Sequence, residues 1–151
     1  MAKKSAGILL WKRERGALCV LLVHPGGPFW KNKDAGAWSI PKGEYDEGEE
    51  ALAAAQREFA EELGELPRGT IKLLGEIRQK TGKVVTGFAV EGDFDCATIR
   101  SNTFEIEWPP RSGKRASFRE VDRAQWFSPE EARQKINPAQ RELIDRLEAA
   151  L

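Results

Sequence analysis

Short apolar runs alternate with charged turns in the N-terminal part of the chain. Residues 6–11 and 17–23 form two such runs, and the charged turn Lys12-Arg13-Glu14-Arg15-Gly16 lies between them. Continuous aliphatic runs of this length are typical of strands that are buried on both faces. The pattern therefore predicts a hairpin, with Cys19 as a small core residue. A loop over 24–36, rich in proline and glycine, and a short strand over 38–40 are expected to follow.

The strongest helical pattern runs from about Glu49 to Leu63. Its apolar residues recur at helical spacing on one face, and Gly64 is suited to the position just after the last turn. The residues of this face are Leu52, Ala55, Phe59 and Leu63. An acidic loop over 43–48 leads into this predicted helix.

The C-terminal half of the chain reads as further strands followed by two helices. The predicted strands are 71–80 and 83–91, paired as a hairpin, then 103–108, and a short strand that ends at 127. Ser128-Pro129 begins one helix, and Asn137-Pro138 begins another with Leu143, Ile144, Leu147 and Leu151 on its inner face. Because helices and strands are interspersed without repeats or linkers, residues 1–151 are predicted to form a single mixed α/β domain.

Composition narrows the class of protein. The 151 residues are 40% hydrophobic, and 24 Lys+Arg balance 24 Asp+Glu. A net charge of zero excludes the whole-chain basicity of a dedicated nucleic-acid binder, so no stable nucleic-acid partner is expected. Two cysteines are too few for a disulfide framework. No apolar stretch approaches the length of a membrane span or a signal sequence, so we expect a cytoplasmic protein without a membrane partner.

The balanced total conceals a segregation of charge. Residues 44–65 contain nine acidic residues and a single basic one, Arg57, whereas the remainder contains 23 basic and 15 acidic residues. Glu58, Glu61 and Glu62 fall within about a third of the helix circumference, away from the apolar stripe of Leu52, Phe59 and Leu63. Carboxylates at such spacing repel one another, and Mg²⁺ or Mn²⁺ would relieve that repulsion. The residues alone leave two interpretations open, a metal site and an ordinary solvated acidic face.

A motif in this segment favours the metal site. Seven residues stand in the spacing G-x5-E-x7-R-E-U-x-E-E-x-G, where U is apolar: Gly43, Glu49, Arg57, Glu58, Glu61, Glu62 and Gly64. In this motif the chain resembles the Nudix hydrolases. It departs from the usual pattern in Glu65, which stands where an aliphatic residue is common. The resemblance implies an α/β/α sandwich with a central mixed sheet, and hydrolysis of a nucleoside diphosphate linked to another group.

The same resemblance implies roles for individual residues. Glu58 and Glu62 would be metal ligands, with Glu61 as a further ligand or as the base that activates water, and Glu58 as the second choice for that base. The carbonyl of Lys42 would be an additional ligand, and Arg57 would orient the glutamates. Glu49 would tie the loop to the helix. Glu105 and Glu107 would either move toward the metals or remain surface residues. The implied cofactor is Mg²⁺ or Mn²⁺.

Substrate contacts are harder to assign from the sequence. We expect the Lys42 side chain to meet a phosphate and Trp38 to contact the substrate. Arg111 and Lys114, in a basic stretch with Arg115 and Arg119, would clamp outer phosphates unless this stretch is a solvated loop. One or two aromatic residues would stack on a base, drawn from Phe29, Trp30, Trp38, Trp108 and Phe118, although each singly is more often a core residue. His24 is expected to be an unremarkable loop residue.

Two short segments narrow the resemblance within the family. Ser5-Ala6-Gly7-Ile8 and Trp38-Ser39-Ile40-Pro41-Lys42-Gly43 are similar to the branch that cleaves diadenosine tetraphosphate and related dinucleoside polyphosphates. The alternatives are a nucleoside triphosphate pyrophosphohydrolase, a non-catalytic nucleotide-binding module of the same fold, and an acidic docking face for a basic partner. The sequence leaves the oligomeric state open.

Overall fold

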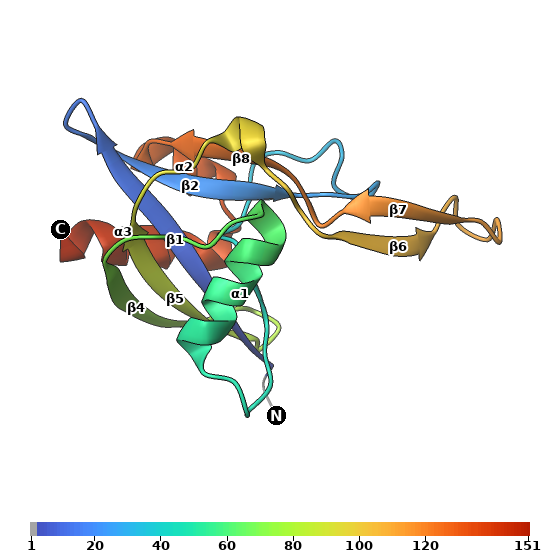
Figure 1. The fold of residues 1–151 in the computed structure, drawn as a ribbon, viewed down its shortest axis with the longest axis horizontal. Coiled ribbons are helices and arrows are strands. Elements are labelled where there is room, and N and C mark those ends of the chain that lie inside the picture. Colours follow the sequence, from blue (N-terminus) through green and yellow to red (C-terminus); the bar gives the residue numbers. More distant parts are fainter. Residues whose placement is uncertain (1–2) are drawn as a thin grey trace.

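A computed structural model describes residues 3–151 and shows one mixed sheet between helical layers (Figure 1). Strands pair in the order β4-β5-β1-β2-β8, and β3 pairs with β1 outside this path. Their bounds are β1 Lys4–Glu14, β2 Ala17–Pro25, β3 Lys42–Glu44, β4 Ile71–Arg78, β5 Val84–Glu91 and β8 Val121–Phe127. The β1–β5 pair is parallel and the others are antiparallel. The predicted sandwich with a central mixed sheet is thus confirmed.

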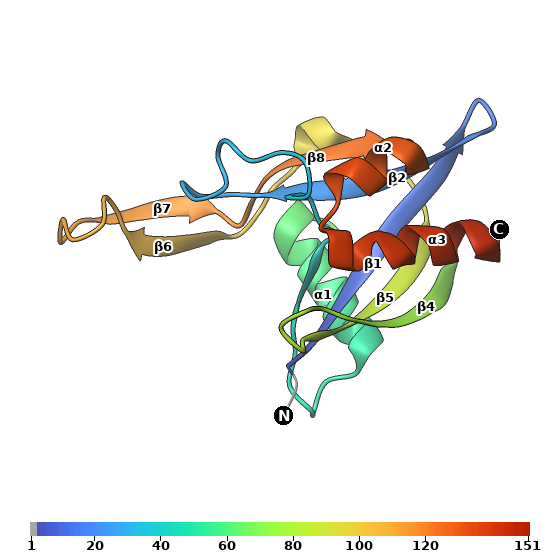
Figure 2. The ribbon, with the colours of Figure 1, turned by 180° about the vertical axis from the view of Figure 1, so that it is seen from behind.

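Helices cover both faces of this sheet. Helix α1 (Ala51–Leu63) packs on one face, and α2 (Pro129–Lys135) and α3 (Arg141–Ala150) lie on the other (Figures 1 and 2). Two single-turn 3₁₀ helices, η1 (Cys96–Thr98) and η2 (Pro138–Gln140), lie in the connections. Within residues 3–151, no helix is long and apolar enough to cross a membrane.

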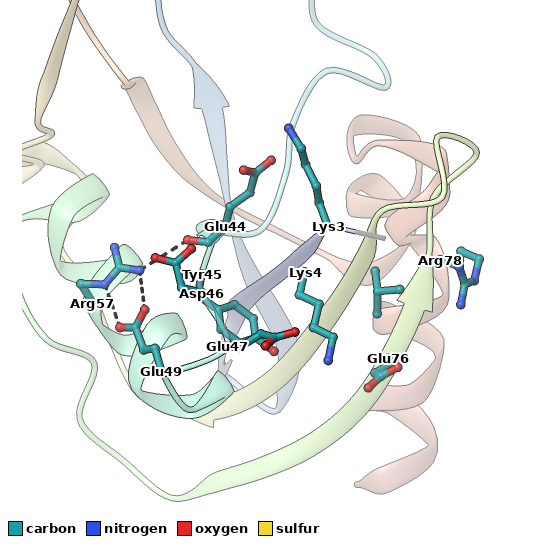
Figure 3. Close-up of a pocket in the computed structure, with 11 residues that line it drawn as sticks. Lys3, Lys4, Glu44, Tyr45, Asp46, Glu47, Glu49, Arg57, Glu76 and Arg78 are labelled. Atoms are coloured by element: carbon teal, nitrogen blue, oxygen red, sulfur yellow. Dashed lines mark hydrogen bonds and ion pairs between the residues drawn. The ribbon is translucent and has the colours of Figure 1, made fainter. Parts of the chain in front are cut away.

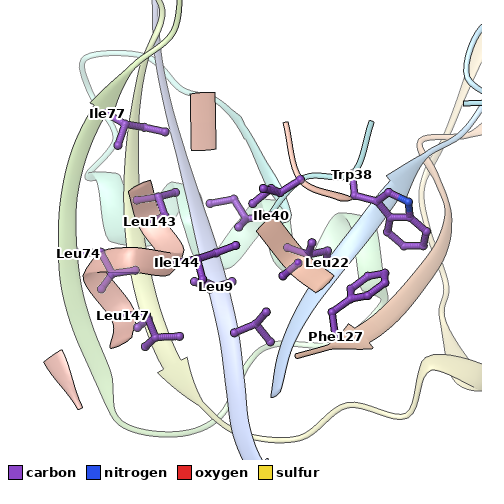
Figure 4. Close-up of a cluster of buried hydrophobic side chains, with 14 of the residues drawn as sticks. Leu9, Leu22, Trp38, Ile40, Leu74, Ile77, Phe127, Leu143, Ile144 and Leu147 are labelled. Carbon is purple, nitrogen blue, oxygen red and sulfur yellow. The ribbon is translucent and has the colours of Figure 1, made fainter. Parts of the chain in front are cut away.

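The alternation of side chains along β1 divides the core into two layers. Ile8 and Leu10 face α1, where they pack with Phe59, while Leu9 faces the opposite layer with Leu143. All five side chains are essentially inaccessible to solvent. Figure 4 shows the α3 side, where Leu143, Ile144 and Leu147 point between the strands. Both faces of β1 are therefore buried, as its continuous apolar run predicted.

A second, two-stranded sheet projects from the body of the domain (Figures 1 and 2). It consists of β6 (Thr103–Glu107) and β7 (Arg115–Arg119), and we call residues 103–119 the arm. Phe104 lies directly opposite Phe118, and their rings are 6.1 Å apart. The predicted strand at 103–108 is confirmed. The stretch from Arg115, considered above as a loop, is instead a strand, because its alternating Ala116 and Phe118 continue the apolar face of β6.

Several other predictions are corrected in detail. Residues 38–40 make only isolated bridges, and the paired strand is β3, which begins at Lys42. Helix α1 begins at Ala51 rather than at 49, and α3 begins at Arg141 after the 3₁₀ turn of η2. Cys19 is half-buried because it lies near the turn that joins β1 to β2. Leu151 is 48% exposed because it follows the last turn of α3.

Candidate active site

The C-terminal half of α1 and strand β3 bring the acidic residues of the motif together. The backbone N–H of Lys42 donates to the carboxylate of Glu62 over 3.0 Å, which joins the start of β3 to the helix. A methyl group on Gly43 would lie 2.0 Å from the carboxyl carbon of Glu58. The absence of a side chain at Gly43 therefore lets the Glu58 carboxylate lie against the strand.

Arg57 makes the contacts that an orienting residue needs. Its guanidinium donates to Glu49 over 2.9 and 3.0 Å (Figure 3), and to Glu58 over 2.8 Å. A longer contact of 3.4 Å reaches Glu61. The bonds to Glu49 and Glu58 raise the pKa of Arg57, so it stays charged at any physiological pH. One cation thus links the loop glutamate to two glutamates of the helix.

Burial and like charge raise the pKa of two acidic groups on α1, Glu58 and Glu62. Burial raises the pKa of Glu62 well above its usual value, and the charges of Glu58 and Glu120 raise it further. The pKa of Glu58 is also raised, by burial first and by Glu61, against the opposing effect of Arg57. Such mutual repulsion is the electrostatic state that a bound cation would relieve.

Glu120 is an acidic member of this group that the sequence did not reveal. It lies between β7 and β8, and burial, followed by the charges of Glu58 and Glu61, raises its pKa. Backbone hydrogen bonds fix it, since its N–H donates to the carbonyl of Asn102 and its carbonyl accepts from Gly26. The one signal in the sequence is its place as the acid that ends the basic stretch from Arg111, which does not indicate proximity to α1.

Glu105 and Glu107, by contrast, are not brought to the cluster. Both are exposed on β6. Glu105 pairs with Arg115 at 3.5 Å, and Glu107 accepts the backbone N–H of Arg111. Arg111 and Lys114 are themselves exposed in the turn at the end of the arm. The structure therefore places all four residues away from the α1 carboxylates.

A cavity of about 220 Å³ opens beside the acidic cluster. Lys42, Glu62 and Glu120 form its wall on the cluster side, and Trp30 and Asn137 belong to the rest of its lining. Burial lowers the pKa of Lys42, with the charge of Lys83 acting in the same direction. The cavity therefore joins polar, titratable groups to an aromatic ring, a combination common in small-molecule sites.

Trp38 shapes the floor of this cavity as a core residue. It is 2% exposed, and its ring packs edge-to-face with Phe127 at 5.1 Å and His24 at 5.2 Å. Its indole N–H donates to Asp34. Because both packing partners cover the Trp38 ring, it offers no free stacking surface to a base. The expected contact of Trp38 with substrate is therefore limited to the small part of the ring that lines the cavity.

His24 is fully buried at the end of β2 rather than in a loop. Its Nδ1 lies 2.8 Å from a carboxylate oxygen of Asp122, and its Nε2 lies 2.6 Å from the carbonyl oxygen of Lys33. Both ring nitrogens therefore lie within hydrogen-bonding distance of an oxygen atom from another part of the chain. His24 thereby ties residues 26–37, which we call the 26–37 loop, to β8.

A second, larger cavity of about 790 Å³ lies on the loop side of Arg57 (Figure 3). Lys3, Lys4 and Arg78 line it together with acidic residues of the loop and of β4. Its cations are matched by anions of the same lining, among them Glu44, Glu47 and Glu76. It is separate from the cavity that Lys42 and Glu62 line.

Comparison with known proteins accounts for the motif and the fold together. The family model described as NUDIX domain matches residues 1–147. The chain belongs to the Nudix family. The motif at Gly43–Gly64 is therefore its Nudix box, which includes β3, the loop that follows it, and α1.

Individual relatives are similar over part of the sequence or in fold. A curated RNA pyrophosphohydrolase from Caulobacter vibrioides is 41% identical over 61 residues, which cover 37% of this chain and 34% of that protein. The NUDIX domain of Shewanella oneidensis NrtR, solved with ADP ribose, has a TM-score of 0.68 at 18% identity and is matched over 99% of this chain and 88% of that one. A C. elegans Ap4A hydrolase has a TM-score of 0.65 at 19% identity and is matched over 97% of this chain and 96% of that one.

Proposed function

We propose that this Nudix protein is a divalent-metal-dependent pyrophosphohydrolase that cleaves dinucleoside polyphosphates such as diadenosine tetraphosphate (Ap4A). One observation carries the proposal. Glu62 and Glu120, two carboxylates with raised pKa values, line a cavity together with Lys42, and the charge of Glu58 acts on both. A carboxylate cluster alone would repel a polyphosphate, so this arrangement fits a substrate that arrives with metal ions.

The donor set suits Mg²⁺ or Mn²⁺, because it consists of carboxylate and carbonyl oxygens. Within the described part of the chain, no three acidic, histidine or cysteine side chains are placed to hold a metal ion as they stand. Glu58 and Glu61 contact Arg57, and Glu62 accepts from Lys42. The metal would be held by Glu58, Glu61, Glu62 and the Lys42 carbonyl. Glu120 would be able to join them, because burial and the charges of Glu58 and Glu61 raise its pKa. A bound metal would polarise the phosphoryl group and acidify water.

The chain's own residues supply the remaining requirements. Arg57 holds Glu58 and approaches Glu61, which fixes the carboxylates relative to the helix. Glu61 remains our first candidate for the base that removes a proton from the attacking water. Glu58 remains the second candidate. Glu120, which lies outside the motif, is a further one, because its raised pKa brings it closer to the value that suits a base near neutral pH.

Substrate recognition would begin in the cavity beside the cluster. Its volume suits one nucleoside, with Trp30 on one wall and Lys42 near the attached phosphates. The fold is shared with the C. elegans Ap4A hydrolase, and the similarity of the 38–43 segment to that branch supports the same substrate class. The principal rival is a nucleoside triphosphate pyrophosphohydrolase, because the cavity beside the cluster would also suit a substrate with one nucleoside. The intact Arg57-Glu58 and Glu61-Glu62 pairs oppose a non-catalytic module.

Product analysis separates these functions. The purified protein would be incubated with Ap4A, ATP or GTP, with Mg²⁺, with Mn²⁺ or with a chelator, and the products resolved by ion-exchange chromatography. Metal-dependent release of ATP and AMP from Ap4A supports the proposal. Activity confined to triphosphates, with release of pyrophosphate, supports the rival. No product from any substrate contradicts both enzymatic assignments.

A further inference from the structure

The arm is rooted at the acidic cluster but extends away from it. Asn102, just before β6, donates its N–H to the carbonyl of Glu61 at the end of α1, and Glu120 follows β7 directly. Strand β6 alone extends about 14 Å from this root. A two-stranded sheet is marginal by itself, so its apolar face needs a covering partner.

The 26–37 loop covers part of that face and leaves an aromatic surface beside it. Gly27 lies under the ring of Phe104, and Phe29 packs edge-to-face on Trp108 at 5.6 Å. Phe29 is nevertheless 63% exposed, and the adjacent Trp30 is 42% exposed. We call Phe29 and Trp108 the aromatic pair of the arm. Because His24 and Gly26 hydrogen-bond the loop to β8 and to its preceding residue, this surface is held in place.

The aromatic pair is continuous with the catalytic cavity. Trp30 lines the cavity together with Glu62 and Glu120, and Phe29 is its neighbour in the chain. The arm also carries four basic residues against two acidic ones. The surface beside the cavity therefore combines net positive charge with exposed aromatic rings. These are the groups that recognise phosphates and nucleobases respectively.

We infer that the aromatic pair of the arm binds the second nucleoside of a dinucleoside polyphosphate whose first nucleoside occupies the cavity. This inference rests on the proposed function. In such a substrate the two bases are separated by the polyphosphate chain, so the second base must be received at a distance from the first. Phe29 and Trp108 lie at the outer part of the arm, and Arg111 and Lys114 in the adjoining turn supply positive charge near that base.

The test compares a substrate with two bases against a substrate with one. The ratio of kcat/KM for Ap4A to kcat/KM for ATP would be measured for the wild type and for Phe29→Ala, with Phe29→Tyr as the conservative variant. Loss of one base-stacking contact corresponds to a fall of about 5- to 150-fold. We expect the ratio to fall by that factor in Phe29→Ala and to recover in Phe29→Tyr. Leu73→Ala removes a side chain of similar exposure, 62%, from the distant strand β4 and should leave the ratio unchanged.

Other outcomes overturn the inference without touching the proposed function. An unchanged ratio in Phe29→Ala, with both substrates still hydrolysed, shows that the pair does not bind the second nucleoside. If Phe29→Ala lowers kcat/KM for a 5′-triphosphorylated dinucleotide but not for Ap4A, the surface binds nucleic acid instead. A wild-type dimer in sedimentation that Phe29→Ala converts to monomer assigns it to a second copy of the chain. Absence of any metal-dependent hydrolysis by the wild type is a failure of the proposed function itself.

Discussion

Gly43 permits a substitution that should damage catalysis while leaving the fold intact. An alanine methyl group at this position would lie 2.0 Å from the carboxyl carbon of Glu58 and 2.3 Å from each of its oxygens. Ordinary carbon contacts are about 3.5–4.0 Å, so the carboxylate must retreat by about 1.5 Å or more. It would then lose its 2.8 Å contact with Arg57. A displacement of about 1 Å in a catalytic group can cost roughly 100-fold in rate.

The fold should tolerate the same change. The displaced group is the end of a flexible side chain rather than backbone, and Gly43 lacks the positive φ that disfavours alanine. We expect Gly43→Ala to change the free energy of unfolding by less than about 1 kcal/mol, since the lower entropy of the unfolded chain offsets part of the strain. Urea denaturation measures this quantity, and initial rates with Ap4A and Mg²⁺ measure turnover.

A matched control lies in the loop between β3 and α1. A methyl group on Gly48 would contact nothing within 4 Å, and Gly48 has no positive φ either. Gly48→Ala should therefore keep wild-type turnover. If Gly43→Ala also turned over at the wild-type rate, the position of the Glu58 carboxylate would not matter and the assignment of Glu58 as a metal ligand would be refuted.

Three further predictions concern the core and the acidic cluster. Trp38→Ala should lower the free energy of unfolding by about 3–5 kcal/mol in urea denaturation, because Trp38 is a buried core residue; a change below about 1 kcal/mol would argue against that placement. Glu62→Gln should stabilise the metal-free protein. Because the pKa of Glu62 is higher in the folded state than in the unfolded state, the folded state binds this proton more tightly. The wild type therefore loses stability as pH rises from about 4.5, the pKa of an unperturbed glutamate, through the folded-state pKa. Melting temperatures measured across pH should show a smaller loss in Glu62→Gln, and identical pH profiles would contradict the repulsion. Glu120→Gln should reduce kcat at least tenfold if Glu120 acts as base or ligand, whereas an unchanged kcat would place it outside the chemistry.

The elements that the sequence predicted well depend on short-range patterns. The face of α1 follows from the spacing of Phe59 and Leu63, and the β1–β2 hairpin follows from two apolar runs around a glycine turn. The Nudix box is likewise local, since its seven positions lie within 22 residues. Local geometry within one helix brings Glu58 and Glu62 to the same side, so the centre of the candidate site was predictable.

The features that were missed depend on contacts between distant parts of the chain. Glu120 approaches the cluster only because the arm is anchored at Asn102 to the end of α1. The partner of His24 is Asp122, 98 positions away, so burial of the histidine has no local signature. From the sequence, Trp38 could be either a substrate contact or a core residue, like any aromatic residue near a loop. It is a core residue because its ring packs on Phe127 from β8. Composition and periodicity do not predict these contacts.

We propose that the carboxylates of the Nudix box hold a metal ion that this protein uses to hydrolyse a polyphosphate. The most direct test is the rate of ATP and AMP release from Ap4A as a function of Mg²⁺ concentration, measured in parallel for the wild type and Glu62→Gln. We predict Mg²⁺-dependent turnover for the wild type and a rate at least about 100-fold lower for Glu62→Gln, with its folded structure retained. Equal rates for the two proteins, or wild-type hydrolysis that persists in a chelator, would contradict the account.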